Sequence, residues 1–436
     1  MATQYATHRD RIPPVSLDLN VRGLRPSATV AINERCNLLL REGRQIFKLG
    51  LGQSPFPVPE SVVDKLRTHA DRKDYLAVRG LTELRSAVAD YHRRRQGLAC
   101  SLEDVLVGPG SKELMFLLQL VYYGDLVIPT PSWVSYAPQA QILGHKIRWV
   151  RTDRATGWRM TPERLEAVCA EDPDRPRLVI LNYPNNPTGG TYKLDELKRL
   201  AEVARRYRVI LLSDEIYGEL HFRGQHVSVA RFYPEGTIVS SGLSKWCGAG
   251  GWRLGTFLFP PSLRWLLDAM AAVASETFTS TSAPIQYAAV RAYYGGYDIE
   301  TYLGDSRRIL RALARGCHDR LTAAGLDVPV ARGGFYLYPD FGPVADRLHA
   351  RGLLTGRQIC EQLLEDTGVA ILPGTDFGGF PEELTARLAF VNFDGARALA
   401  AAQTVPRDHP LDEGFLQDTC AATLTAIERI GEWVAG

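Results

Sequence analysis

Short apolar runs alternate with longer amphipathic stretches between residues 102 and 259. The apolar runs lack a polar alternation, which is typical of strands that are buried on both faces of a sheet. They cover residues 105–107, 126–129, 178–182, 209–213, 238–240 and 254–259. The stretch after Tyr192 is typical of the segments between them, because Leu194, Leu197, Leu200 and Ala201 share one helical face. We therefore predict an α/β, three-layer fold with a mostly parallel central sheet.

The two ends of the chain show a different pattern. A long helical stretch begins near Tyr297, and a helix over residues 356–367 separates short apolar runs that begin at Phe335, Val369 and Arg387. Near the other end, residues 46–52 are predicted to form a strand that leads into a Gly-rich turn. We expect both ends to build a smaller α+β domain. The predicted division is an N-terminal arm and small-domain segment at 1–54, a large domain at 55–305 and a C-terminal small domain at 306–436.

Length and composition are those of an ordinary globular enzyme. The chain has 436 residues, 45% of them hydrophobic and 23% charged, with a net charge of +2. This balance predicts no nucleic-acid partner and no membrane partner, and the basic runs at 93–95 and 205–208 are interpreted as solvated helix faces. No apolar signal segment or membrane-spanning run is recognised, and the seven cysteines form no CxxC pair. We expect a cytoplasmic protein without disulfides or a metal site.

Candidate chemistry lies just after the predicted strands, where open α/β sheets bind ligands. The run 105–107 ends in Gly108, Pro109 and Gly110, and a helix is predicted from about Ser111. Backbone N–H groups at a helix start attract anions, and Ser111 adds a hydroxyl. The alternative is a tight turn with a serine N-cap. The spacing is not that of a P-loop.

Two further strand ends carry unusual polar residues. The segment 181–190, LNYPNNPTGG, follows a buried strand, and Pro187 would hold Asn186 rigidly enough to donate its amide to a ligand. Asp214 follows an apolar run and is expected to be buried, so it needs a partner such as a cationic ring nitrogen. Tyr217 lies close enough in sequence to reach the same ligand. The alternatives are a plain loop and a helix N-cap.

One lysine and two arginines complete the candidate set. Lys245 lies between an apolar strand and a Gly-rich loop, and a desolvated lysine is a competent amine nucleophile. Arg253 precedes the next strand and suits a phosphate group. Arg387 begins an apolar strand, so it needs an anion, either a substrate carboxylate or a structural partner.

These segments together resemble one enzyme family. NYPNNPTG at 182–189, SDEIY at 213–217, SGLSK at 241–245 with GGWRLG at 250–255, and RLAF at 387–390 are similar to motifs of the class I/II aminotransferases. Those enzymes have fold type I and use pyridoxal 5′-phosphate. The resemblance extends to LGLGQSPFPVPE at 49–60 and YLAVRGLTELR at 75–85, so it covers nearly the whole chain.

The resemblance implies a role for each residue of the catalytic centre. Lys245 resembles the lysine that carries the cofactor as a Schiff base and later moves a proton at the substrate Cα. Asp214 resembles the carboxylate that keeps the pyridine nitrogen protonated. Asn186 and Tyr217 resemble the pair that hydrogen-bonds the phenolic oxygen, and Trp133 matches the aromatic residue that stacks on the ring.

The resemblance also implies a phosphate cradle, a substrate clamp and a dimer. The cradle consists of Gly110, Ser111, Lys112, Ser244 and Arg253. Tyr75 matches a tyrosine that reaches the phosphate of the neighbouring subunit, which implies a homodimer with shared active sites. Arg387, Asn186 and the backbone at Gly52 resemble the clamp on the substrate α-carboxylate. The implied reaction is ping-pong transfer of an amino group from an amino acid to a 2-oxo acid.

The sequence departs from the family pattern at Gly242, where many relatives have a second serine, so Ser244 is expected to take more of the phosphate contact. The alternatives are another pyridoxal-phosphate reaction, such as β-elimination, cyclopropane formation or amino-acid oxidation, and a non-catalytic ligand sensor. The pocket wall is expected to involve the N-terminal region, Trp133, Tyr136 and the partner subunit. The substrate side chain stays open.

Overall fold

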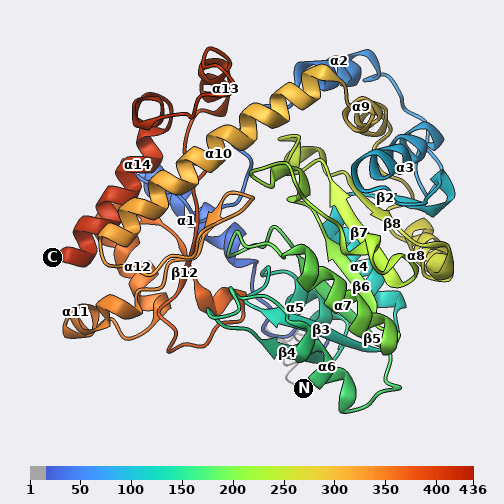
Figure 1. Ribbon diagram of the computed structural model, residues 1–436, viewed down its shortest axis with the longest axis horizontal. Coiled ribbons are helices and arrows are strands. Elements are labelled where there is room, and N and C mark those ends of the chain that lie inside the picture. The colour runs from blue at the N-terminus through green and yellow to red at the C-terminus, as the bar shows by residue number, and fades with distance from the viewer. Residues whose placement is uncertain (1–15) are drawn as a thin grey trace, which may run out of the picture.

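The computed structural model describes residues 16–436. Its largest sheet has seven strands in the order β2-β8-β7-β6-β5-β3-β4 (Figure 1). The strand bounds are β2 Val105–Gly108, β3 Asp125–Thr130, β4 Ile147–Arg151, β5 Arg177–Asn182, β6 Ile210–Asp214, β7 Thr237–Gly242 and β8 Gly255–Leu258. Neighbouring strands are parallel except for β8, which runs antiparallel to both β2 and β7. The mostly parallel sheet that the apolar runs predict is therefore confirmed.

Helices cover both faces of this sheet because successive strand residues point in opposite directions. Leu212 of β6 packs in a core with residues of α4 Ser111–Val121, α5 Tyr136–Ile142 and α8 Arg264–Glu276. Its neighbour Leu211 packs with α6 Pro162–Ala170 and α7 Leu194–Arg206 on the opposite face. Val239 of β7 packs with α3 Thr82–Gln96 and α9 Ala283–Tyr294, next to which lies α2 Glu60–Thr68. The result is the three-layer α/β arrangement expected from the pattern.

A second body contains the C-terminal elements together with an N-terminal segment (Figure 1). The chain enters it through α1 Ala28–Arg41 and β1 Phe47–Lys48, and β1 pairs in parallel with β10. A small antiparallel sheet has the order β11-β12-β9. The remaining bounds are β9 Tyr336–Leu337, α11 Ala345–Ala350, α12 Gly356–Thr367, β10 Val369–Ala370, β11 Leu372–Pro373, β12 Ala386–Ala389, α13 Gly395–Gln403 and α14 Glu413–Ala435.

Helix α10, Tyr297–Ala323, runs diagonally across the molecule and joins the two bodies (Figure 1). Residue 305 lies inside this helix, so the division at 54 and 305 stays a prediction, and residues 1–15 of the proposed arm lie outside the described residues. The sequence pattern missed β4, a strand at the end of the sheet order in which Val150 alone is fully buried. Within residues 16–436, no helix is both long and apolar enough to cross a membrane.

Candidate active site

A cavity of about 640 Å³ opens at the carboxyl ends of β5, β6 and β7. Both bodies line it, as expected for ligand sites in open α/β sheets. Its lining residues are Thr29, Leu51, Gly52, Gln53, Ser111, Lys112, Trp133, Asn182, Asn186, Asp214, Ile216, Tyr217, Ser244, Lys245, Gly250, Gly251, Arg253, Tyr336 and Arg387. The set combines one carboxylate with four cationic side chains, so the cavity has the charge to bind anions.

Lys245 follows β7, and its Nζ donates a hydrogen bond of 2.7 Å to the carbonyl oxygen of Gly52. The pKa of Lys245 is lowered to about 8, mainly by burial and then by the nearby charges of Arg387 and Arg253, while the carboxylate of Asp214 acts in the opposite direction. At neutral pH such an amine has a sizeable unprotonated fraction. The structure therefore supplies a nucleophilic amine at the base of the cavity.

Asp214 is the last residue of β6 and is 3% exposed. Its Oδ2 accepts a hydrogen bond of 2.5 Å from the hydroxyl of Tyr136, and Oδ1 lies 3.5 Å from Oγ of Ser240. Burial raises the pKa of Asp214 to about 6, although these hydrogen bonds oppose the shift. A cation placed next to this carboxylate would restore its charged form.

Two asparagines at the end of β5 connect Asp214 to the substrate side of the cavity. The side-chain amide of Asn182 donates to the backbone oxygen of Asp214 at 2.9 Å, and its Oδ1 accepts from the backbone N–H of Asn186 at 2.8 Å. Asn186 is 3% exposed, so its side chain is held between the strand and the cavity. Next to it, the hydroxyls of Tyr217 and Tyr336 lie 2.7 Å apart.

The N-terminus of α4 and the side chain of Arg253 form a cationic corner of the cavity. Gly110 is the N-cap, with φ of +95°, and it provides no capping side chain. A Cβ there would lie 2.3 Å from Nη2 of Arg253, so only glycine lets the guanidinium approach the helix start. Arg253 itself has a left-handed backbone with φ of 56°, a strained state typical of functional sites. Burial and then the charge of Arg253 lower the pKa of Lys112.

Arg387 lies in β12 and is 1% exposed. Its guanidinium donates to Oδ1 of Asn186 at 3.2 Å and to the carbonyl oxygen of Gly50, while Nε has no partner. Within residues 16–436 no carboxylate forms an ion pair with it, and the rings of Tyr336 and Phe377 lie 4.8 and 4.9 Å from its Cζ. A buried cation without a counter-ion is costly, so this guanidinium is a site for an incoming anion.

Comparisons with known proteins now decide the family. The model of the family Aminotransferase class I and II matches residues 44–397. The chain belongs to this family. It is 33% identical over 370 residues to the aspartate/prephenate aminotransferase of Thermus thermophilus, a match that covers 84% of this chain and 92% of that relative. It is 32% identical over 375 residues to the aspartate aminotransferase of Geobacillus stearothermophilus, with 84% and 92% covered.

Solved structures agree with this assignment. The aspartate aminotransferase from Thermus thermophilus with maleate superposes with a TM-score of 0.82 at 29% identity, covering 96% of this chain and all of that one. The enzyme from Rhizobium meliloti gives a TM-score of 0.81 at 28% identity, with 96% and 99% covered. The chain is therefore a pyridoxal-phosphate-dependent aminotransferase that acts on an amino acid and a 2-oxo acid.

The cavity of this aminotransferase fits the cofactor that the family uses. A volume of about 640 Å³ is within the range of small-molecule and cofactor sites. The cationic corner at Gly110 and Arg253 matches a phosphate dianion at a helix N-terminus. Asp214, whose carboxylate is buried without a cationic partner in the described residues, matches a ring nitrogen, and the Lys245 amine matches an aldehyde carbon.

The structure brings together almost all of the residues that the sequence singles out. Every predicted site residue lines the cavity except Gly110, which lies directly behind Arg253, and Tyr75. Tyr75 is 88% exposed and lies outside the cavity of its own chain. The serine N-cap considered for Ser111 is wrong, because Gly110 occupies the cap and Ser111 is the first helical residue.

Two tyrosines lie where the sequence did not predict them. Tyr136 is not a wall of the cavity, because it is 1% exposed and lies beneath it, bonded to Asp214. Tyr336 was missed, although the alternation of aromatic residues from Phe335 is a signal for a strand with one face toward a site. The departure at Gly242 has a steric reason, since a Cβ there would lie 2.7 Å from the carbonyl oxygen of Leu254.

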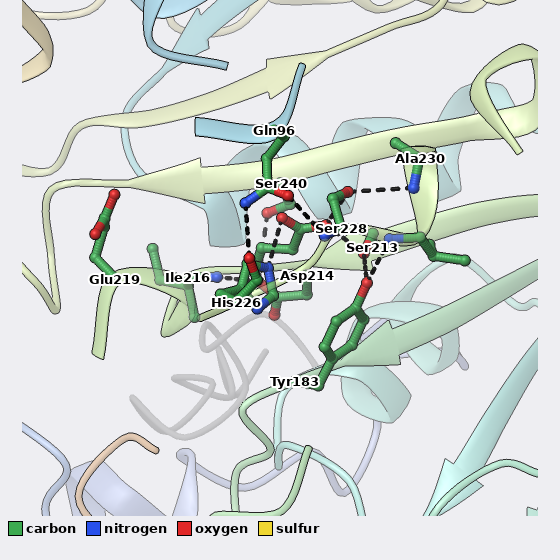
Figure 2. Close-up of polar contacts among 12 residues, drawn as sticks. Gln96, Tyr183, Ser213, Asp214, Ile216, Glu219, His226, Ser228, Ala230 and Ser240 are labelled. Atoms are coloured by element: carbon green, nitrogen blue, oxygen red, sulfur yellow. Dashed lines mark hydrogen bonds and ion pairs between the residues drawn. The ribbon is translucent and has the colours of Figure 1, made fainter. Parts of the chain in front are cut away.

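A second polar network lies on the far side of the β6 end, away from the cavity. The carboxylate of Glu215 accepts from Nε2 of His226 at 2.8 Å, from Oγ of Ser213 at 2.7 Å and from Oγ of Ser228. Figure 2 shows the hydroxyl of Tyr183 pointing toward Ser213, at 3.2 Å, and toward the loop that carries Ser228. Glu215 is thus surrounded by donors, whereas Asp214 beside it faces open space.

Proposed function

We propose that this aminotransferase takes L-aspartate as its amino donor and passes the amino group to a 2-oxo acid, with Lys245 holding the cofactor covalently. The observation that carries the proposal is the buried guanidinium of Arg387, which faces the same cavity as Lys245 and has no ion pair within residues 16–436. A guanidinium in this position suits the α-carboxylate of an amino acid. Asn186, bonded to it, and the backbone at Gly52 complete the clamp.

The names of the relatives favour a dicarboxylic substrate. Lys112, Arg253 and Arg387 line the cavity together with one carboxylate, that of Asp214. A phosphate dianion and an α-carboxylate together carry three negative charges, which these three cations match, so the charge of the cavity by itself does not select a side-chain carboxylate. Relatives at about 30% identity are named for aspartate, and one solved relative was obtained with maleate, which is a dicarboxylate.

Two groups of residues hold and tune the cofactor. Its phosphate is held by the start of α4 and by the side chains around it: Gly110, Ser111, Lys112, Ser244 and Arg253. Asp214 holds the ring nitrogen in its protonated state, Asn186 and Tyr217 hydrogen-bond the phenolic oxygen, and Trp133 stacks on the ring. When bound, pyridoxal phosphate supplies an aldehyde that captures amines and a cationic ring that withdraws electrons from the bonds at the substrate Cα.

Lys245 transfers the proton in each half of the reaction. Its amine, with a pKa lowered to about 8, would accept the proton from the substrate Cα and then donate it to the cofactor carbon that had been the aldehyde carbon. Arg387 fixes the carboxylate so that the Cα–H bond faces Lys245. The 2-oxo acid then occupies the same clamp, and the same residues run the sequence in reverse, which gives ping-pong kinetics.

The proposal includes a homodimer with shared active sites in the cytoplasm. Tyr75 is 88% exposed in the single chain, and Tyr294 and Tyr297 are 72% and 85% exposed. Aromatic side chains exposed to this degree are typical of interface residues. In the dimer, Tyr75 reaches the phosphate bound by the partner subunit.

The test is a single turnover with L-aspartate in the absence of an acceptor. Wild-type enzyme is expected to release one equivalent of the 2-oxo acid and to convert its cofactor into pyridoxamine phosphate. Lys245→Ala is expected to lose turnover and to lose the borohydride-reducible bond to the cofactor, whereas the exposed Lys198→Ala retains both. Turnover by Lys245→Ala would refute the role of Lys245. If the enzyme releases an oxo acid from aliphatic or basic amino acids but not from aspartate, L-aspartate is not its amino donor.

A further inference from the structure

A second and larger concavity lies behind the active site, where the two bodies meet. Its volume is about 930 Å³, and we refer to it as the basic groove. Loop 188–194, loop 221–225, the middle of α10 and residues 329–332 form its walls. The charged lining residues are Arg159, Lys193, Arg223, Arg311, Arg315, Arg332 and Asp319, with His221 and His318 beside them. Six cations thus face one carboxylate among the described lining residues.

Three of these arginines are free to bind an anion. Arg223, Arg311 and Arg332 are exposed, and within residues 16–436 none of them forms an ion pair. By contrast, Arg159 pairs with Glu196 at 2.8 Å. Surface arginines elsewhere on the enzyme are mostly paired with carboxylates, so this local surplus is not a property of the whole surface.

The pKa of a histidine in the groove reflects the same surplus of positive charge. The pKa of His221 is lowered to about 4, mainly by burial; the charges of His226 and of the nearby arginines Arg307, Arg223 and Arg332 contribute to this shift. His221 therefore stays neutral at physiological pH and adds no charge, but it can donate or accept a hydrogen bond. Beside it, Phe222 and the 60%-exposed Val330 provide apolar surface within the same groove.

The groove is tied to the active site through short backbone contacts. The N–H of Arg332 donates to the carbonyl oxygen of Gly189 at 2.8 Å, and the N–H of Phe222 donates to the carbonyl oxygen of Arg332 at 2.9 Å. Gly189 belongs to the loop that carries Asn186, and the strand after Arg332 carries Tyr336 in the cavity wall. A ligand that spans the groove would thus join the two bodies directly behind the substrate clamp.

We propose that the basic groove binds an oligophosphate, with a nucleoside triphosphate as the best-fitting class. Several guanidiniums converge on one concavity, and a ligand that engages them together must carry several negative charges on adjacent groups. A triphosphate does so, while the apolar surface at Phe222 and Val330 suits a base and sugar. The volume of the groove matches a ligand of this size.

The experiment is calorimetric titration of the holoenzyme, in which the cofactor already fills the phosphate cradle. The probes are ATP, inorganic tripolyphosphate and adenosine, each at low and at raised salt. We expect ATP and tripolyphosphate to bind, with affinity that falls as salt rises, and adenosine not to bind. ATP is expected to bind more tightly than tripolyphosphate if the base contacts the groove, and saturating ATP is expected to raise Tm by about 3 °C.

Matched variants locate the site. Arg223→Gln, Arg311→Gln and Arg332→Gln are each expected to weaken ATP binding about tenfold, and the triple variant to abolish it. Arg397→Gln, an exposed arginine on α13 outside the groove, is the control and is expected to bind as the wild type does. These variants leave the catalytic residues intact, so turnover with an amino donor confirms that each one is folded.

Two results would overturn the proposal. One is absence of heat and of a Tm shift with both ATP and tripolyphosphate at low salt. The other is wild-type affinity in the triple variant, which would place the anion elsewhere on the enzyme. Tighter binding of a short RNA than of ATP, lost in the triple variant, would replace the oligophosphate with a nucleic acid as the ligand. Each readout is independent of the donor, so failure here leaves the proposed aspartate reaction standing.

Discussion

Asp214 and Glu215 are neighbours in the chain, yet their surroundings differ completely. Asp214 faces the cavity, and burial raises its pKa to about 6. Glu215 faces the opposite side, where burial also opposes its charge, but His226 and the hydroxyls of Ser228 and Ser213 outweigh burial and lower its pKa. Both carboxylates are less than 10% exposed, so burial alone does not separate them. What differs is the closeness and kind of their partners. Glu215 has an imidazole and two hydroxyls at close range, whereas Asp214 has one close donor, the hydroxyl of Tyr136, and two contacts at 3.4 and 3.5 Å.

This difference separates a binding site from a structural network. Donors and an imidazole surround the Glu215 carboxylate, so it is fully satisfied without a ligand. Asp214 has Tyr136 as its close hydrogen-bond donor, and across the cavity Arg387 likewise has no counter-ion within residues 16–436. Unsatisfied buried charge is costly, and it persists where a ligand completes it. The unpaired groups on one side of the β6 end therefore mark the active site.

The largest expected effect comes from removing the charge of Asp214. Asp214→Asn is expected to lower kcat/KM for amino transfer about 10³-fold, because the ring nitrogen loses the carboxylate that stabilises its cationic form. Folding is expected to be unharmed, since a buried carboxylate without a cation is replaced by a neutral amide. Steady-state kinetics of the holoenzyme measure this effect. The matched control is Glu215→Gln, which is expected to keep kcat/KM within about tenfold; equal losses in both variants would erase the distinction between the two carboxylates.

The next effect is on stability and belongs to Glu215. Glu215→Gln is expected to lower the free energy of unfolding by about 3 kcal/mol, because His226 and two buried hydroxyls lose their charged acceptor. Urea denaturation of wild type, Glu215→Gln and Asp214→Asn provides the comparison. If Asp214→Asn lowers the free energy of unfolding as much as Glu215→Gln does, the carboxylate of Asp214 is stabilised by its hydrogen-bond partners as strongly as that of Glu215.

The third effect, at most as large as the second, is a pH dependence of stability in the apoenzyme, with opposite sign for the two carboxylates. The pKa of Asp214 is about 6 in the folded chain against 3.8 as its ordinary value, so the folded state binds the proton more tightly. Its contribution is full below pH 3.8 and is lost as pH rises to about 6, by at most about 3 kcal/mol. The contribution of Glu215, whose pKa is lowered, is present above 4.5 and is lost as pH falls.

Denaturation of the two apoenzyme variants between pH 3 and pH 7 separates these contributions. Relative to wild type, Asp214→Asn is expected to become more stable as pH rises, and Glu215→Gln less stable. Bound cofactor is expected to cancel the first trend, because its ring nitrogen pairs with the carboxylate of Asp214. The same slope in both variants would contradict the environments described for the two residues.

Local pattern was sufficient for most of the fold and for most of the site residues. Buried strands have continuous apolar runs, so six of the seven large-sheet strands were located by sequence. Strand β4 was missed because four of its five residues are exposed or half-buried, so it has no continuous apolar run. Lys245, Asp214 and Asn186 were found because polar residues directly after an apolar strand are unusual. Tyr336 lies far away in sequence, and its place beside Tyr217 depends on how the second body packs.

The amino-acid sequence by itself determined the α/β class, the family and the set of residues that carry the chemistry, because apolar periodicity and strand-end motifs are local properties of the chain. The tertiary structure decided which charges are left without partners. It gave Glu215 a histidine and left Asp214 with a tyrosine, and it enclosed Arg387 without a carboxylate. It also gathered the arginines of the basic groove from loops and a helix far apart in sequence. The physical reason is that the energy of a buried charge depends on the groups that surround it in space, and these come from distant parts of the chain.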